Sequence, residues 1–149
     1  MIYGSVTAHP TGETTLGEAR TVEFERIRGV SVMPGTVSLD SQSGISFSGE
    51  NKETIIDFLA NMRVDYYGRT SSIEYSTQGP HIEVMLLGDP EYLGVHCIFL
   101  EDGSLTVMPL DNPTQANGWR YQLCNTEEFR ALEQLIAGLA RNSEAANSQ

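Results

Sequence analysis

The sequence is poor in basic residues. Of its 149 residues, 20 are Asp or Glu and only nine are Lys or Arg, and the single lysine is Lys52. The formal net charge at pH 7 is −11. Because such a surface repels phosphate groups, we expect the chain to bind neither nucleic acid nor an anionic membrane surface. The same charge would attract a basic protein, although acidity also serves solubility alone.

Long apolar runs and paired cysteines are also missing. No apolar stretch approaches the roughly 18 residues that a membrane span needs, and residues 1–5 lack the basic lead of a signal peptide. Cys97 and Cys124 lie too far apart in the sequence for a zinc site with paired cysteine spacing. We therefore expect a cytoplasmic protein with two free thiols and no membrane anchor.

The motifs that define common enzyme classes are absent as well. The sequence has no glycine-rich phosphate loop, no His-Glu-x-x-His helix and no nucleophile elbow. The segment that begins at Asp40 lacks the oxygen ligands of a calcium loop, and we predict no metal and no cofactor. Cys124 precedes a predicted helix, which can activate a thiol, but the sequence places no base beside it, so a structural cysteine is favoured. We predict no catalytic residue.

Strand patterns occupy most of the chain. Alternating residues, a Pro-Gly turn at 34–35 and the hairpin signal Asp102-Gly103 all indicate antiparallel pairing. The strands from Ile73 to Leu110 form a predicted meander. The predicted strands are 2–6, 22–25, 30–32, 36–39, 45–48, 64–68, 73–75, 81–87, 95–100, 105–110 and 119–123.

Two segments have helical periodicity instead. Apolar residues from Ile55 to Met62 recur on one face after a predicted N-cap at Asn51. A second stripe runs from Phe129 to Leu139, after a predicted cap at Asn125 and a capping-box Glu128. Together these patterns predict an α+β fold, in which an antiparallel sheet of hairpins and a meander carries two helices, about 51–63 and 126–141, packed on one face. We expect one domain, 1–142, and a flexible C-terminal tail, 143–149.

The stretch between Thr70 and Trp119 is the best candidate for a partner surface. It contains seven acidic residues and no Lys or Arg. We predict that these carboxylates steer a basic protein partner and that an aromatic side chain after the stretch anchors it. The predicted partner-binding residues are Glu74, Glu83, Asp89, Glu91, Glu101, Asp102, Asp111 and Trp119.

Three kinds of function are compatible with this sequence, and each leaves the oligomeric state open. The first is a small acidic inhibitor that blocks a basic partner by steric occlusion, in the manner of immunity proteins, antitoxins and phage anti-defence proteins. That likeness is one of size, charge and missing motifs. The second is a small-ligand-binding domain or minor enzyme with a sheet–helix pocket, to which Arg69, His81, Tyr92 and His96 could contribute. In an acidic chain a phosphorylated ligand would require arginines gathered in the cleft. The third is a structural or assembly protein of a phage particle or secretion system.

Overall fold

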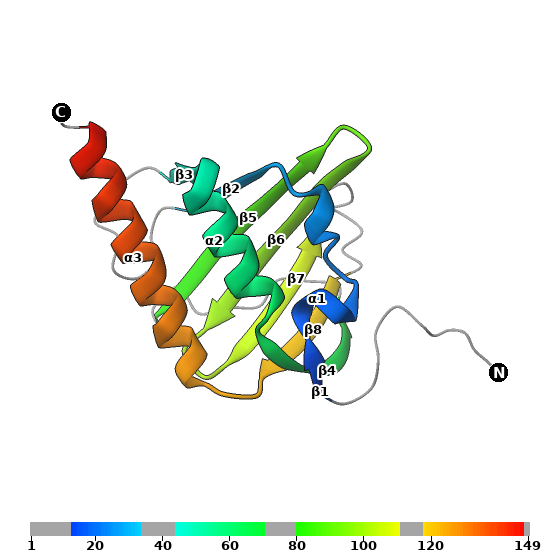
Figure 1. Cartoon of the computed structure of the whole chain (residues 1–149). Helices are drawn as coiled ribbons and strands as arrows, with labels where there is room; N and C mark the ends of the chain where they lie inside the picture. The colour runs from blue at the N-terminus through cyan, green and yellow to red at the C-terminus, as the bar shows by residue number, and fades with distance from the viewer. Residues whose placement is uncertain (1–12, 34–43, 71–79, 111–117, 148–149) are drawn as a thin grey trace.

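The computed structural model describes residues 13–33, 44–70, 80–110 and 118–147. In this part of the chain, eight strands form one antiparallel sheet in the order β1-β4-β8-β7-β6-β5-β2-β3. The helices lie together on one face of that sheet (Figure 1). The predicted α+β class is therefore confirmed. The strands predicted at 2–6, 36–39 and 73–75, with the turn at 34–35, lie outside the described residues.

The centre of the sheet is a meander in which four consecutive strands are also neighbours in space, and its first three strands are the described part of the predicted meander. The alternate residues Ile82, Val84 and Leu86 are fully buried towards the core, as the pleat of a strand requires. The two longest strands, β5 and β6, have nine residues each, and their hairpin extends past the neighbouring strand ends (Figure 1). The four strands are β5 (His81–Asp89), β6 (Tyr92–Leu100), β7 (Ser104–Pro109) and β8 (Gly118–Leu123).

The outer strands are shorter. On one side β4 (Arg63–Thr70) pairs with β8, and β1 (Glu13–Thr15) pairs with β4. On the other side β2 (Gly29–Val32) pairs with β5, and β3 (Ile45–Phe47) pairs with β2. Within the described residues, each edge strand has three residues.

The two long helices are present, but their ends differ from the predicted ones. Helix α2 (Gly49–Ala60) begins after Ser48, two residues before the predicted cap at Asn51. Helix α3 (Glu127–Asn147) continues beyond the predicted end at 141, through a segment in which Ala145 and Ala146 have the highest helix propensity of any residue type. The predicted apolar stripes are buried against the sheet, including Ile55, Leu59, Phe129, Leu132 and Ile136.

The segment predicted as a strand at 22–25 is not one. It follows the short helix α1 (Leu16–Ala19), and its second half belongs to the 3-10 helix η2 (Phe24–Arg26). The alternation that predicted a strand has another cause, because Val22 is buried and Phe24 packs against the core without any strand pairing. This irregular segment matters for the site, since it brings Arg26 to the turn between β5 and β6.

Candidate functional site

The predicted partner-binding acids do not form one patch. Asp89 and Glu91 lie at the β5–β6 turn, whereas Glu101 and Asp102 lie at the β6–β7 turn. Because the nine residues of β6 separate these turns at about 3.3 Å per residue, the two pairs are roughly 25–30 Å apart. Two further predicted residues lie outside the described part of the chain, Glu74 and Asp111.

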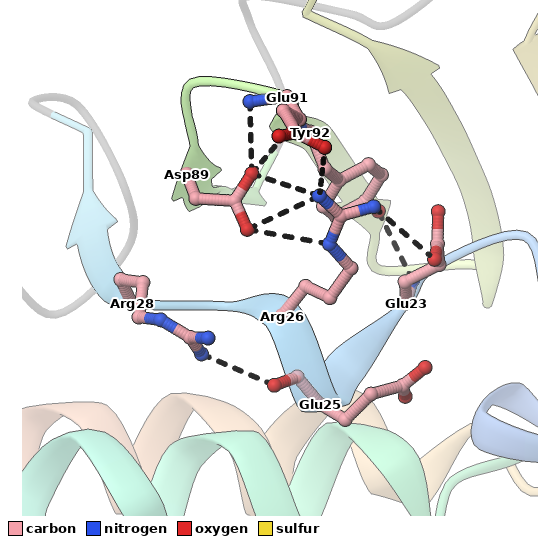
Figure 2. Close-up of polar contacts among 7 residues, drawn as sticks. All are labelled: Glu23, Glu25, Arg26, Arg28, Asp89, Glu91 and Tyr92. Atoms are coloured by element: carbon pink, nitrogen blue, oxygen red, sulfur yellow. Dashed lines mark hydrogen bonds and ion pairs between the residues drawn. The ribbon is translucent and has the colours of Figure 1, made fainter.

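At the β5–β6 turn, Arg26 holds the carboxylate of Asp89 with a forked contact (Figure 2). Its Nη2 lies 2.9 Å from Oδ1 and 3.2 Å from Oδ2, and its Nε lies 3.3 Å from Oδ2. The same Oδ1 accepts hydrogen bonds from the backbone N–H groups of Glu91 and Tyr92, at 2.9 and 2.8 Å. The hydrogen bond with Arg26 lowers the pKa of the Asp89 carboxyl, helped by the two backbone bonds. This turn is therefore fixed in one shape before any partner arrives.

A second contact ties the hairpin to the segment before η2. The hydroxyl of Tyr92 accepts a hydrogen bond of 3.0 Å from the backbone N–H of Glu23, and the guanidinium carbon of Arg26 lies 5.4 Å from the centre of the Tyr92 ring. Figure 2 shows these groups around the turn. The irregular segment thus presents Arg26 to a turn more than sixty residues away in sequence.

The tip of the β5–β6 hairpin combines charge with exposed apolar groups. The side chain of Glu91 is 91 % exposed, and its nearest cation is Arg26 at 4.0 Å. Leu87 and Leu93, on either side of the turn, are 37 % and 46 % exposed. They are two of the three large hydrophobic side chains that are exposed among the described residues, with Tyr67 on β4 as the third.

The opposite end of the meander is different. The carboxylate of Glu101 is paired with Arg130 of α3. Asp102 uses its Oδ1 to accept a hydrogen bond of 2.9 Å from the backbone N–H of Ser104, which stabilises the turn. No large hydrophobic side chain of the described β6–β7 turn is exposed. Of the two acidic ends, only the β5–β6 tip offers an apolar contact as well.

Trp119 belongs to the β5–β6 end of the molecule. An open cavity of about 480 Å³ lies there, and both Trp119 and Glu91 line it. The guanidinium carbon of Arg69 lies 5.1 Å from the centre of the indole ring, and Arg69 Nε donates a hydrogen bond of 3.1 Å to the carbonyl of Gly118. Within the described residues, the indole Nε1 is buried and has no hydrogen-bond partner.

Three of the nine basic residues of the chain line this cavity, Arg20, Arg26 and Arg69. Two acidic side chains, Glu23 and Glu91, line it as well. The arginines of the cavity are therefore concentrated relative to the chain as a whole, although Glu23, Asp89 and Glu91 all lie within 4.0 Å of Arg26. Its remaining lining residues are Thr21, Tyr92, Gly94, Val95, Pro109 and Trp119.

Glu83 lies between two histidines, apart from the other predicted acids. Its Oε1 is 3.2 Å from His81 Nε2, and its Oε2 is 3.1 Å from His96 Nε2. Glu83 pairs in register with Ile98, whereas Val84 and its partner Cys97 are core residues, so this cluster faces away from the core. Of the four residues expected to share a ligand pocket, Arg69 and Tyr92 line the cavity, while the two histidines belong to this separate cluster. In the described ranges, no group of His, Cys, Asp and Glu is arranged to hold a metal ion.

The two cysteines are free, as predicted. Burial raises the pKa of the Cys97 thiol to about 12, so this group stays protonated. At Cys124, partial burial and the nearby carboxylates of Glu13 and Asp65 raise the pKa of the thiol, which is the opposite of what a nucleophile needs. Strand β7 separates the strand before Cys124 from the strand that carries His96.

No protein-family model, no curated protein and no solved structure matches this chain. None of the helices in the described ranges is long and apolar enough to cross a membrane. The function must therefore be inferred from the chemistry of the β5–β6 end, where the sequence pointed to Asp89, Glu91 and Trp119 but not to Arg20, Arg26, Leu87 or Leu93.

Proposed function

We propose that this chain is a small acidic inhibitor that acts in the cytoplasm, where it binds a basic protein and blocks it by steric occlusion. The tip of the β5–β6 hairpin, formed by Leu87, Asp89, Glu91 and Leu93, is the contact surface. The observation that carries the proposal is that one hairpin tip carries a carboxylate that is 91 % exposed and two exposed leucines, one on each face of the hairpin because Leu87 pairs with Gly94.

The three kinds of group at the tip supply different parts of the binding energy. The exposed carboxylate and the net charge of −11 accelerate encounter with a basic surface. The leucines gain free energy when the partner removes them from water, at about 25 cal/mol per Å² of apolar surface. Because Arg26 and the backbone N–H groups already hold Asp89, little conformational entropy is lost when the turn is bound.

The two acidic turns of the meander provide a matched pair of variants. Glu91→Arg reverses the charge at the proposed contact, whereas Asp102→Arg makes the same reversal at the other end of β6. Tagged wild-type protein should retain a basic protein from the native lysate at about 50 mM salt and release it at about 500 mM, because the Debye length falls roughly threefold over that range.

We expect Glu91→Arg to weaken binding of the retained protein by tenfold or more, which corresponds to about 1.4 kcal/mol. Asp102→Arg should bind nearly as well as wild type. Leu93→Ser should also weaken binding at about 50 mM salt although it leaves the net charge unchanged, because its contribution does not depend on charge. Retention of no basic protein, or equal binding by Glu91→Arg and wild type, would show that the proposal is wrong.

A further inference from the structure

The cavity beside the hairpin has a composition that the proposed inhibitor function does not explain. A basic partner is attracted by carboxylates, yet this cavity gathers three arginines from separate parts of an acidic chain. Arg20 follows α1, Arg26 ends η2, and Arg69 lies on β4. Arginines concentrated in a cleft are what an acidic protein needs in order to take an anionic ligand.

Arg20 is the cation most available to such a ligand. It makes no hydrogen bond or ion pair with any described residue, whereas Arg26 is already held by Asp89. Its backbone is also unusual, because a φ of 65° makes it the one non-glycine residue with positive φ in the described ranges. Glycine is the residue favoured at such a helix C-cap, and an arginine there has a strained backbone.

The other wall of the cavity is apolar and aromatic. It contains Val95, Pro109 and the indole ring of Trp119. The buried Nε1–H of that ring lacks a hydrogen-bond acceptor among the described residues, and such orphan donors are rare in folded proteins. The volume of about 480 Å³ lies within the range of small-molecule sites, roughly 300–1,000 Å³.

We propose that this cavity binds a small organic anion, in which a carboxylate or phosphate group meets Arg20 and Arg69 and a compact apolar body lies against Val95, Pro109 and Trp119. Arginine guanidinium groups pair well with the oxygens of both acids, so the cavity chemistry is shared by a carboxylate and a phosphate ester. The site needs no protein partner, and it can be tested with the purified chain alone.

The sequence offers a direct readout, because Trp119 is its only tryptophan. All indole fluorescence therefore reports from the wall of this cavity. The probes are phenyl phosphate, benzoate and inorganic phosphate, titrated at constant ionic strength, with phenol as the uncharged comparison. We expect phenyl phosphate or benzoate to change the Trp119 emission saturably, with a Kd of about 1 mM or tighter. Inorganic phosphate and phenol should bind more weakly, since each lacks one half of the ligand.

The variant Arg20→Gly tests whether the Arg20 side chain binds the ligand or only supports the fold. Glycine relieves the left-handed backbone, so this variant should melt at the same temperature as wild type or higher. It should nevertheless bind the best probe about tenfold more weakly, the loss expected for one charge-assisted hydrogen bond. Arg141→Gln, which removes an exposed arginine near the end of α3, should bind as wild type does.

Two results would overturn the site. One is the absence of a saturable change in Trp119 emission with any charged probe up to about 10 mM. The other is Arg20→Gly binding the probe as tightly as Arg141→Gln does. The ratio of the affinities for phenyl phosphate and benzoate distinguishes the two acids as the preferred ligand group. None of these outcomes depends on whether a basic protein binds the hairpin tip.

Discussion

Glu128 shows how one side chain can take a role other than the one its sequence position predicts. It was expected to complete a capping box in the first turn of α3. Asn125 does cap this turn, because its Oδ1 accepts a hydrogen bond of 3.0 Å from the backbone N–H of Glu127. The Glu128 carboxylate instead turns towards the protein, and its Oε2 is buried without a hydrogen-bond partner in the described residues. Burial of this group raises the pKa of the Glu128 carboxyl above its ordinary value of 4.5.

This raised pKa gives Glu128 a definite effect on stability. Below about pH 4, Glu128 is protonated in both the folded and the unfolded chain, and its burial carries no charge penalty. As the pH rises through the folded-state pKa, the unfolded chain releases the proton more readily, so the contribution of Glu128 to the free energy of unfolding falls. Glu128→Gln keeps the shape of the side chain and removes that dependence. Urea unfolding should therefore show the variant gaining stability relative to wild type between about pH 4 and pH 7.

Glu127→Gln is the control for this experiment, because it removes the same charge from the same turn at an exposed position. A carboxylate near the positive end of a helix stabilises it, so this control should lower the stability at neutral pH. If Glu128→Gln behaves like Glu127→Gln, desolvation is not the dominant effect at Glu128.

Individual residues of the site could be predicted only where they lie in, or next to, a segment with a clear sequence pattern. Asp89 and Glu91 stood out because they belong to an acidic stretch, and Trp119 because it is a large aromatic residue beside a connection. Their nearness to one another follows from the meander, in which successive turns alternate between two ends of the sheet. Arg20 and Arg26 had no such signal, because an irregular segment far away in sequence carries them to the cavity.

At the scale of elements, long segments with a regular apolar pattern were predicted correctly, whereas a short segment of alternating residues was not. Strands β5 to β8 and helix α3 are long enough to contain several apolar residues at regular spacing, and this spacing predicted the elements. The segment 22–25 offered only two alternating apolar residues, and tertiary contacts of Glu23 and Arg26 decided its shape. The conformation of a short irregular element depends on contacts with residues far away in sequence, which a local sequence pattern does not include.

The β6–β7 turn depends on the conformation of one glycine. Gly103 has a φ of 96°, and its N–H and C=O make hydrogen bonds to Leu100 and Leu123 at 2.9 and 2.8 Å. A Cβ at this position would lie 2.3 Å from Gln122 Nε2 and 3.0 Å from Thr126 Cγ2. We expect Gly103→Ala to lower the free energy of unfolding by about 1–3 kcal/mol, through backbone strain and this crowding.

Replacing glycine by alanine at Gly138 should have the opposite effect on the free energy of unfolding. Gly138 lies inside α3, and the nearest atom to an added Cβ is Arg141 Nη2 at 3.9 Å. Gly138→Ala should raise the free energy of unfolding by about 0.5–1 kcal/mol, because alanine is the better helix former. Urea denaturation of both variants measures the difference. Two variants of equal stability would mean that the β6–β7 turn does not need a positive φ.

At the scale of the whole molecule, charge has opposite consequences for binding and for folding. The same acidic surface that is proposed to attract a basic partner repels itself in the folded state. Ion pairs such as Arg63 with Glu13 and Arg26 with Asp89 offset part of this repulsion. Such pairs contribute little because water screens them, and nine bases cannot compensate 20 acids.

Salt should therefore stabilise this protein. Raising NaCl from about 10 mM to about 150 mM shortens the Debye length from roughly 30 Å to 8 Å, which screens long-range repulsion more than contacts at ion-pair distance. We expect the melting temperature to rise by about 5 °C, as scanning calorimetry can measure. A variant with Glu53→Lys and Glu91→Lys has a net charge of −7, because each exchange adds two units to −11. Its melting temperature should respond less to the same salt. A melting temperature that falls with added NaCl would mean that the ion pairs outweigh the repulsion, and that the folded state is held together by its charges rather than strained by them.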